Sequence, residues 1–313
     1  FFGLLRSIVG IFMFGIQTYF LSKAIGYLIR ILIFSIDNSF LEQEIFLTFI
    51  LGLNIIDWIS FSIVIIFQAM MFSVGMQFNK KLINISAITV YLGMILFFFI
   101  VFLSDVKVTT RAFTEILNFG NFLDINNLAP ILTVIGTIFA YFSIIIVSFG
   151  DYSRYVKDEQ NLKKGNLSLI LNLIIFSFFA VFIVVGSDVF LNQKFGDLDG
   201  IFTNPTDIIG KFDNLQITII VLFFIIVASA STNLVANFIP SQYSLINFLP
   251  SILTLKSASY IISIIGFLIG IFWLTVLSQI GILSFIDTFG SFFGPIFGLM
   301  IADYYLVKQS NLS

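Results

Sequence analysis

The sequence predicts an all-α integral membrane protein, and three features of its composition support this fold class. Hydrophobic residues make up 59% of the 313 residues, charged residues make up 10%, and the mean hydropathy is +1.09. A soluble domain contains about 25% charged residues, so this chain is too apolar to be one. No linker or separate soluble segment is evident, and residues 1–313 are interpreted as a single transmembrane domain.

The spans follow from hydropathy, because a helix needs about 20 apolar residues to cross the hydrocarbon core of a bilayer. Eight stretches of the chain satisfy this requirement. They lie at residues 3–33, 45–76, 82–104, 129–150, 167–191, 215–239, 257–280 and 282–306. The first two are long for a single crossing, so we expect them to tilt or to extend beyond the lipid.

The lysines and arginines predict the orientation of these spans, because such residues concentrate on the cytoplasmic side. The densest basic cluster lies at 151–166, and placing it in the cytoplasm puts nine of the 15 basic residues there. The other six fall outside: Lys23, Arg30, Lys107, Arg111, Lys194 and Lys211. The first span then runs outward, and the plasma (inner) membrane is the expected location.

Composition also removes several classes of chemistry. The chain has no cysteine and no histidine, which excludes disulfides, thiolate nucleophiles, imidazole bases and histidine-ligated zinc. The net charge is −2 and no long basic run is present, so a nucleic-acid partner is not expected. No feature indicates a protein partner; the lipid bilayer is the expected surrounding.

Gln17 is the most informative polar residue, because it lies in the middle of the first apolar span. Burying an unpaired amide costs about 2–7 kcal/mol, and lipid offers no hydrogen-bonding partner. Gln17 must therefore face a neighbouring helix, a cavity or a ligand. A hydrogen bond to another helix and a role in binding both remain open at this point.

The sixth span carries two polar stripes. Ala228, Ser231 and Thr232 share one helix face, where a carbonyl and two hydroxyls would suit a weakly held hard cation such as sodium. Asn233 and Asn237 form a second stripe. On an ideal helix Thr232 and Asn237 lie about 140° apart, so one face could not serve both a cation and a ligand. Close helix packing is the alternative explanation for the small residues.

Other polar groups have structural interpretations. Asp151 and Arg154 can form an ion pair at the end of a span, and Pro295 lies between glycines and can bend its helix. Asp57 and Asp287 are acids inside predicted spans, and either could relay protons. The sequence shows no partner for either acid.

Four segments, taken in order, resemble motifs of the nucleobase:cation symporter-1 family, permeases for hydantoin, allantoin, uracil, cytosine and related rings. They are Phe14-Gly-Ile-Gln-Thr-Tyr19, Gly150-Asp-Tyr-Ser-Arg154, the segment from Ser231 to Pro250, and the segment from Gly294 to Val307. The resemblance implies a LeuT-type inverted-repeat bundle of twelve spans, of which this chain would hold the third to the tenth. Residues 1–104 would then be the rest of the first repeat and residues 129–307 would form the second. The chain would be a fragment, consistent with its start at Phe1.

The resemblance also implies a substrate site. Gln17 and Asn237, with Asn233 nearby, would hydrogen-bond the polar edge of a flat heterocycle. Phe142 would stack on one face of the ring. Met13 stands where the family has an aromatic residue, so the pocket would suit a different or smaller ring.

By the same resemblance, Ala228, Ser231 and Thr232 would bind sodium, with protons as the alternative coupling ion and no other cofactor. The implied function is import of a nucleobase or related heterocycle by cation symport with alternating access. Another ring such as thiamine, or a non-transporting receptor or channel on the same scaffold, is the alternative. An enzyme is not expected, because an intramembrane aspartyl protease would need two aspartates in sequence contexts that this chain lacks.

Overall fold

The computed structural model describes residues 2–118, 120, 125–147, 149–196, 202–212, 214–277 and 281–310. Within these residues the chain is helical and forms no strand. In this described part of the chain, seven helical segments are long and apolar enough to cross a membrane, which confirms the all-α, multi-pass class. They are built from α1 (Phe2–Ile36), α3 (Ile55–Phe72), α4 (Met76–Ser104), α8 (Glu159–Phe195), the continuous run of α10 (Leu215–Thr232), η4 (Asn233–Phe238) and α11 (Ile239–Phe248), α12 (Leu255–Thr275), and α13 (Ile282–Ala302) with η6 (Asp303–Val307).

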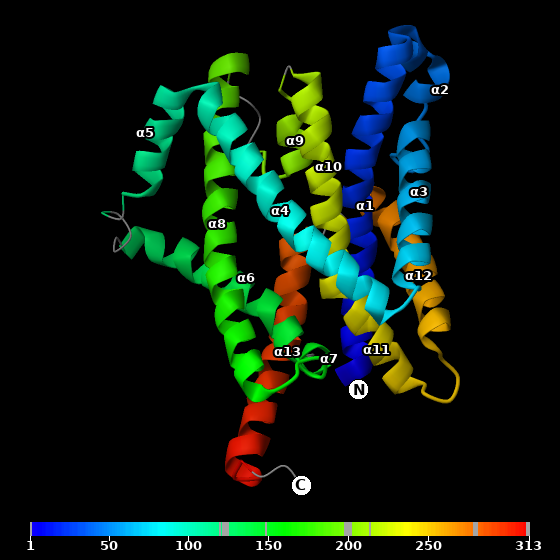
Figure 1. Ribbon diagram of the computed structural model, residues 1–313, viewed down its shortest axis with the longest axis vertical. Coiled ribbons are helices and arrows are strands. Elements are labelled where there is room, and N and C mark those ends of the chain that lie inside the picture. The colour runs from blue at the N-terminus through cyan, green and yellow to red at the C-terminus, as the bar shows by residue number, and fades with distance from the viewer. Residues whose placement is uncertain are drawn as a thin grey trace.

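The fourth predicted span, residues 129–150, corresponds to α6 (Leu128–Val147) and is the one that is not among these seven. Its described apolar part, Leu128–Ala140, is shorter than the other seven. Figure 1 shows α6 running obliquely to α8 and α13 instead of parallel to them. The short helix α7 (Gly150–Ser153) follows it.

The predicted start of the second span, residues 45–76, is wrong, because the spanning helix α3 begins only at Ile55. The short helix α2 (Glu44–Leu47) precedes a turn in which Leu51 adopts a φ of 54°. A capping box between Asn54 and Asp57 then begins α3, because each side chain accepts a hydrogen bond from the other residue's backbone N–H. The apolar residues before Asn54 therefore belong to the connection and not to the crossing.

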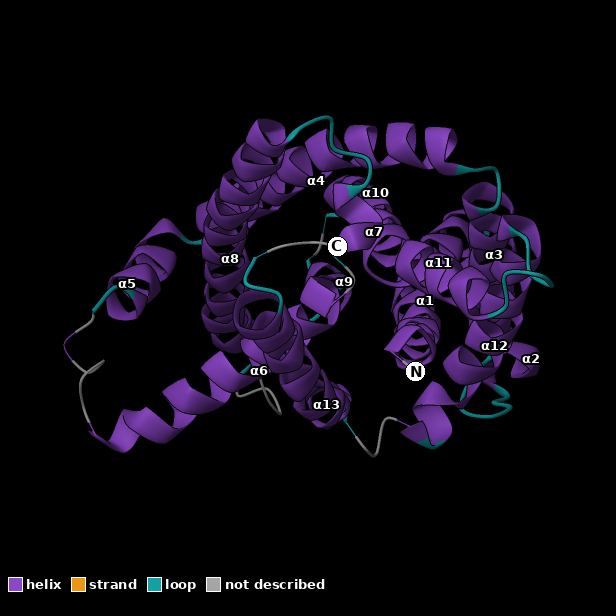
Figure 2. Cartoon of the chain, turned by 90° about the horizontal axis from the view of Figure 1, so that it is seen from below, coloured by secondary structure: helices purple, strands orange, loops and turns teal. Residues whose placement is uncertain are grey.

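Helix α1 is the centre of one half of the molecule, where it packs against α3, α10, η4, α11 and α12 (Figures 1 and 2). Its residues Phe14 and Ile16 are fully buried. A Cβ at Gly15 would lie 2.6 Å from the backbone oxygen of Gly266, so α1 and α12 can approach only because residue 15 is glycine. In the other half, α6 packs on α13, and α4 crosses between α8 and α10.

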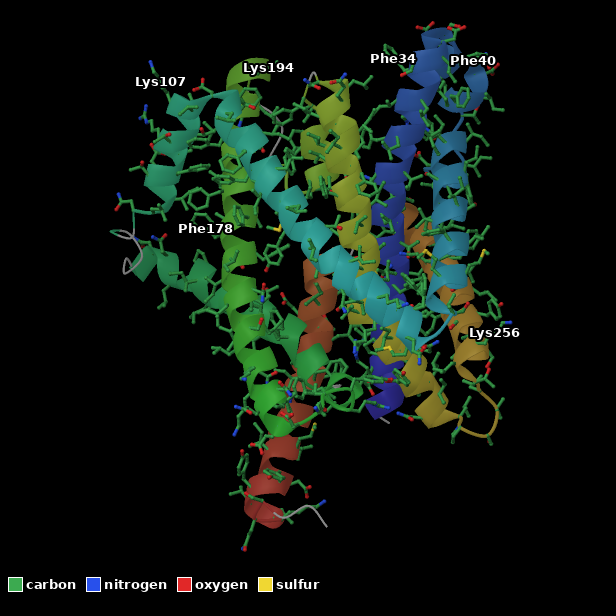
Figure 3. The ribbon with its side chains drawn as sticks, viewed as in Figure 1. Phe34, Phe40, Lys107, Phe178, Lys194 and Lys256 are labelled. Carbon is green, nitrogen blue, oxygen red and sulfur yellow. The ribbon has the colours of Figure 1, made fainter. Side chains whose placement is uncertain are left out.

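Many large apolar side chains lie on the exterior. Phe34, Phe67 and Phe178, for example, expose about half or more of their surface, and Figure 3 shows Phe178 on α8. Large exposed apolar side chains are unfavourable in water, and here they cover the faces of the membrane-spanning helices.

Short elements complete the chain: η1 (Asn38–Glu42), α5 (Val106–Ile116), η3 (Ile125–Asn127) and α9 (Pro205–Ile209). Figure 3 shows Lys107 and Lys194, two of the basic residues predicted to lie outside, at the top of the molecule, and Lys256 in the lower half of the view. Lys23 is an exception, because it lies within α1 with its Nζ 5.5 Å from the centroid of the Tyr19 ring. The direction of the chain across the membrane and its division into two repeats stay predictions.

Candidate functional site

A network of side-chain amides joins α1 to η4. The Nδ2 of Asn237 donates to Oε1 of Gln17 at 2.8 Å and to Oδ1 of Asn233 at 3.0 Å. The Nδ2 of Asn233 donates to the backbone oxygen of Phe14 at 3.2 Å and to Oγ1 of Thr18 at 3.0 Å. The structure thus brings together the three amides that the sequence placed in one candidate site, and each finds a partner away from lipid.

Thr18 and Gln68 extend the network to α3, and sequence reasoning missed both. The Thr18 hydroxyl lies 2.8 Å from Oε1 of Gln68 and 2.7 Å from the backbone oxygen of Phe14. Both side chains are buried, with relative exposures of 0% and 1%. Gln68 carried a usable signal, because it is a glutamine inside an apolar helix and the argument applied to Gln17 applies to it equally.

The sixth span departs from α-helical geometry where the network forms. Residues 233–238 are a π-helix, a class defined by N–H groups that bond five residues back, as Ile239 N–H does to the Leu234 oxygen. Pro240 has no N–H, so the carbonyl of Ala236 lacks the donor that an α-helix would supply four residues later. The guanidinium of Arg6 takes this place, with Nη2 donating to the Ala236 oxygen at 2.6 Å. The N-terminal turns of α1 are thereby fixed to η4.

A cavity of about 300 Å³ lies beside Gln17, between α1, α4, α8, α9 and α10. This volume is at the lower end of the range for small-molecule sites, about 300–1,000 Å³. Most of the wall is apolar and partly aromatic, with a few polar groups. The aromatic side chains are Phe20, Phe97, Phe176 and Phe224, and the polar ones are Gln17, Asn204, Thr206, Ser229 and Thr232.

The predicted cation ligands lie on or next to this cavity. Ala228 and Thr232 are part of its wall. The Ser231 hydroxyl donates to the carbonyl oxygen of Ala228 at 3.0 Å, so two of the three proposed ligand oxygens are neighbours. Thr232 faces the cavity that Gln17 lines, while Asn237 donates to Gln17 itself. The 140° separation on an ideal helix is therefore a poor guide, because the π-turn between these residues shifts their relative facing.

Among the described residues, no group of three or more His, Cys, Asp or Glu side chains could hold a metal ion. Carbonyl and hydroxyl oxygens suit hard cations of low charge, and these are the donors that Ala228, Ser231 and Thr232 offer.

Met13 and Phe142, the predicted ring-flanking pair, contribute nothing to the wall of the Gln17 cavity. Met13 packs against buried apolar residues that include Val9 and Phe293. Phe142 lies half-buried on α6. The aromatic rings that the structure places on the wall come instead from α1, α4, α8 and α10, including Phe20 and Phe176.

The two candidate proton relays differ. Asp57 forms a 2.8 Å ion pair with Arg30, a partner that the sequence did not reveal, and thereby links α3 to α1. Asp287 is exposed and lines a groove between α6 and α13, away from the Gln17 cavity. Neither acid reaches the amide network.

Near the N-terminal end of α1, the Gly150–Arg154 motif forms a polar cluster. Asp151 pairs with Arg154, and the Arg154 guanidinium lies 4.8 Å from the centroid of the Tyr243 ring. Tyr155 and Tyr243 share a hydrogen bond between their hydroxyls. Burial raises the pKa of Asp151, and the charges of Arg154 and Arg6 oppose that rise. The cluster links the segment after α6 to α11 and contains the ion pair that the sequence predicted between Asp151 and Arg154.

Comparison with known proteins agrees with this architecture. The model of the family of permeases for cytosine/purines, uracil, thiamine and allantoin matches residues 1–313. An allantoin permease of Bacillus subtilis is 24% identical over 185 residues, covering 59% of this chain and 36% of the relative. A putative allantoin permease of Escherichia coli is 28% identical over 183 residues, covering 58% and 36%. A purine-uracil permease of Arabidopsis thaliana is 22% identical over 174 residues, covering 56% and 28%.

The matched part thus spans about a third of the length of these curated relatives. No solved structure matches the chain significantly. The relatives are named as permeases and not as enzymes. Because the family model matches all 313 residues, the chain belongs to the family of permeases for cytosine/purines, uracil, thiamine and allantoin.

Proposed function

We propose that the protein is a secondary active transporter that imports a small flat heterocycle, such as uracil, allantoin or a hydantoin, across the plasma membrane. The observation that carries this proposal is the cavity beside Gln17. Its volume fits a single ring, its aromatic residues can stack on the faces of a ring, and Gln17 can hydrogen-bond an edge. Membership of the permease family and the names of the relatives support the same substrate class.

The proposed coupling ion is sodium, with protons as the alternative. Ala228 and Thr232 line the substrate cavity, and the oxygens of Ala228 and Ser231 lie 3.0 Å apart. A cation held there would lie close to the ring, so each ligand would raise the affinity for the other by the same factor. The cation would take the place of the Ser231 proton as partner of the Ala228 carbonyl. Alternating access would then carry both to the cytoplasm.

Uptake into proteoliposomes tests the proposal. Radiolabelled uracil and allantoin are offered to vesicles that carry an inward sodium gradient, an inward proton gradient, or neither. We expect accumulation of one ring above its external concentration and collapse of that accumulation when the coupling gradient is dissipated. Equilibration without accumulation would favour a channel, and binding without uptake would favour a receptor.

A further inference from the structure

The orientation of the Gln17 amide is set by hydrogen bonds that begin at a backbone carbonyl. The oxygen of Phe14 can only accept, so the Asn233 group that lies 3.2 Å away must be its NH2. The same NH2 lies 3.0 Å from Oγ1 of Thr18. Asn233 is fully buried, with both amide hydrogens used. Its Oδ1 therefore faces Asn237.

Thr18 reinforces this orientation. Its hydroxyl has one proton and two possible acceptors, the Phe14 carbonyl at 2.7 Å and Oε1 of Gln68 at 2.8 Å. Whichever acceptor receives the proton, the Thr18 oxygen keeps lone pairs for the NH2 of Asn233. Two acceptors thus hold the same side of the Asn233 amide.

The orientation passes on to the cavity wall. Oδ1 of Asn233 accepts from the NH2 of Asn237 at 3.0 Å, and that NH2 also donates to Oε1 of Gln17 at 2.8 Å. The carbonyl end of Gln17 is therefore engaged by Asn237. The described residues include no hydrogen-bond partner for Nε2 of Gln17, and Gln17 is part of the cavity wall. The donor Nε2 is therefore the Gln17 group that a ligand would find without a described protein partner, whereas Oε1 already accepts from Asn237.

We propose that Asn233, held by the Phe14 carbonyl and Thr18, is a specificity-determining positioning residue that makes Gln17 a hydrogen-bond donor toward the cavity. The site then selects a ring that presents a carbonyl oxygen to Gln17. A ring with an amino group at that place would bring two donors together and leave both unpaired, a loss of about tenfold or more in affinity. This inference rests on the proposed function, because it assigns a role to the ring-binding cavity.

Binding of uracil, cytosine and isocytosine to the purified protein tests the inference. Cytosine and isocytosine each replace a different carbonyl of uracil by an amino group. Whichever of the two uracil carbonyls lies opposite Gln17, one of these two rings therefore carries an amino group at that place. Hydantoin and its 2-imino and 4-imino derivatives serve in the same way if hydantoin binds more tightly. The variants are Asn233→Leu and Thr18→Val. Thr89→Val is the matched control, because the Thr89 hydroxyl bonds only to its own helix at Ile85.

We expect the wild-type protein to favour the dicarbonyl ring over at least one amino or imino ring by about tenfold or more. Asn233→Leu should abolish most of this preference, Thr18→Val should reduce it, and Thr89→Val should leave it unchanged. An unchanged ring preference in Asn233→Leu overturns the inference. If Asn233→Leu does not fold, an unchanged ring preference in Thr18→Val overturns it instead. So does a wild-type protein without such a preference. If no ring binds to the wild-type protein, both the inference and the proposed function fail. If a ring binds but the expected preference is missing, only the inference fails.

Discussion

Two helix contacts in this protein use their polar side chains in opposite ways. Between α1 and η4, amide groups donate across the interface, from Asn237 to Gln17 and from Asn233 to the backbone of Phe14. Between α6 and α13, the hydroxyls of Thr133 and Ser291 donate to backbone carbonyls of their own helices. The first contact is therefore directional, and the second relies on close packing.

The packing contact depends on small residues. A Cβ added at Gly290 of α13 would lie 2.2 Å from the Cβ of Ala140 on α6, so the two helices meet at the glycine. Small residues set the distance between helices in a membrane, whereas amides also set their relative orientation and leave oriented polar groups next to a cavity. Of these two contacts, the α1–η4 contact is the one that can recognise a ligand through hydrogen bonds.

The largest expected effect breaks the packing contact. Gly290→Val should push α6 away from α13 and cost about 3 kcal/mol of stability, because overpacking forces backbone shifts. Gly298→Val is the matched control on the same helix, since no described atom beyond its own turns of the helix lies within 4 Å of a Cβ placed there. Thermal unfolding in detergent measures the difference. Equal melting temperatures for the two variants would show that the α6–α13 contact is not close-packed.

The next effect concerns the directional contact. Arg6→Met removes the donor to the Ala236 carbonyl and should cost about 1.5–3 kcal/mol, the range for hydrogen bonds to charged groups. Pro240→Ala supplies an N–H four residues after Ala236, so Arg6→Met should cost less in that background. A double-mutant cycle of unfolding free energies measures this coupling. Purely additive costs would mean that Arg6 does not compensate for the proline.

A smaller effect is expected on the cavity wall. Thr232→Val keeps the shape of the side chain and removes one oxygen, and should weaken sodium-dependent ligand binding by about 1 kcal/mol. The measurement compares ligand affinity in sodium and in potassium for Thr232→Val and for Thr89→Val. If the sodium dependence of Thr232→Val equals that of the wild-type protein, Thr232 is not a ligand and proton coupling is favoured.

The smallest effect comes from the polar cluster beyond α6. Because burial raises the pKa of Asp151 above 3.8, the folded state holds this proton more tightly than the unfolded state does. The free energy of unfolding should therefore fall as pH rises from below 3.8 through the raised pKa. Asp151→Asn should flatten this dependence in thermal unfolding measured from pH 3.8 upward. A steeper fall in stability in the variant would reverse the sign of the argument.

Much of the fold could be predicted from hydropathy, but one boundary could not. Residues 45–50 are nearly as apolar as a membrane span, yet the chain turns at Leu51 and the Asn54–Asp57 capping box begins α3 afterwards. A hydropathy window averages across such a turn. The capping box was visible in the sequence only as two polar residues, one of which looked like an intramembrane acid.

The candidate site could be predicted only in part, because the sequence shows which polar residues need partners but not which residues supply them. Gln17, Asn233 and Asn237 stand out because amides in apolar helices need partners, and the structure joins them. Which helix supplies the remaining partners depends on tertiary packing, so Thr18 was hidden as an ordinary helical threonine and Gln68 was not connected to α1. The π-turn was likewise not predicted, and neither was the hydrogen bond from Arg6 of α1 to Ala236 within it.

The most direct test of the central claim, that the cavity beside Gln17 binds a heterocycle, is a thermal-shift measurement on the purified protein with uracil, allantoin and hydantoin. Gln17→Ala is compared with the wild-type protein and with Gln43→Ala, an exposed glutamine outside the spans. We predict that one ring stabilises the wild-type protein and Gln43→Ala alike, and that Gln17→Ala binds it more weakly by about 1–3 kcal/mol. Equal stabilisation of Gln17→Ala and wild-type protein would contradict the account.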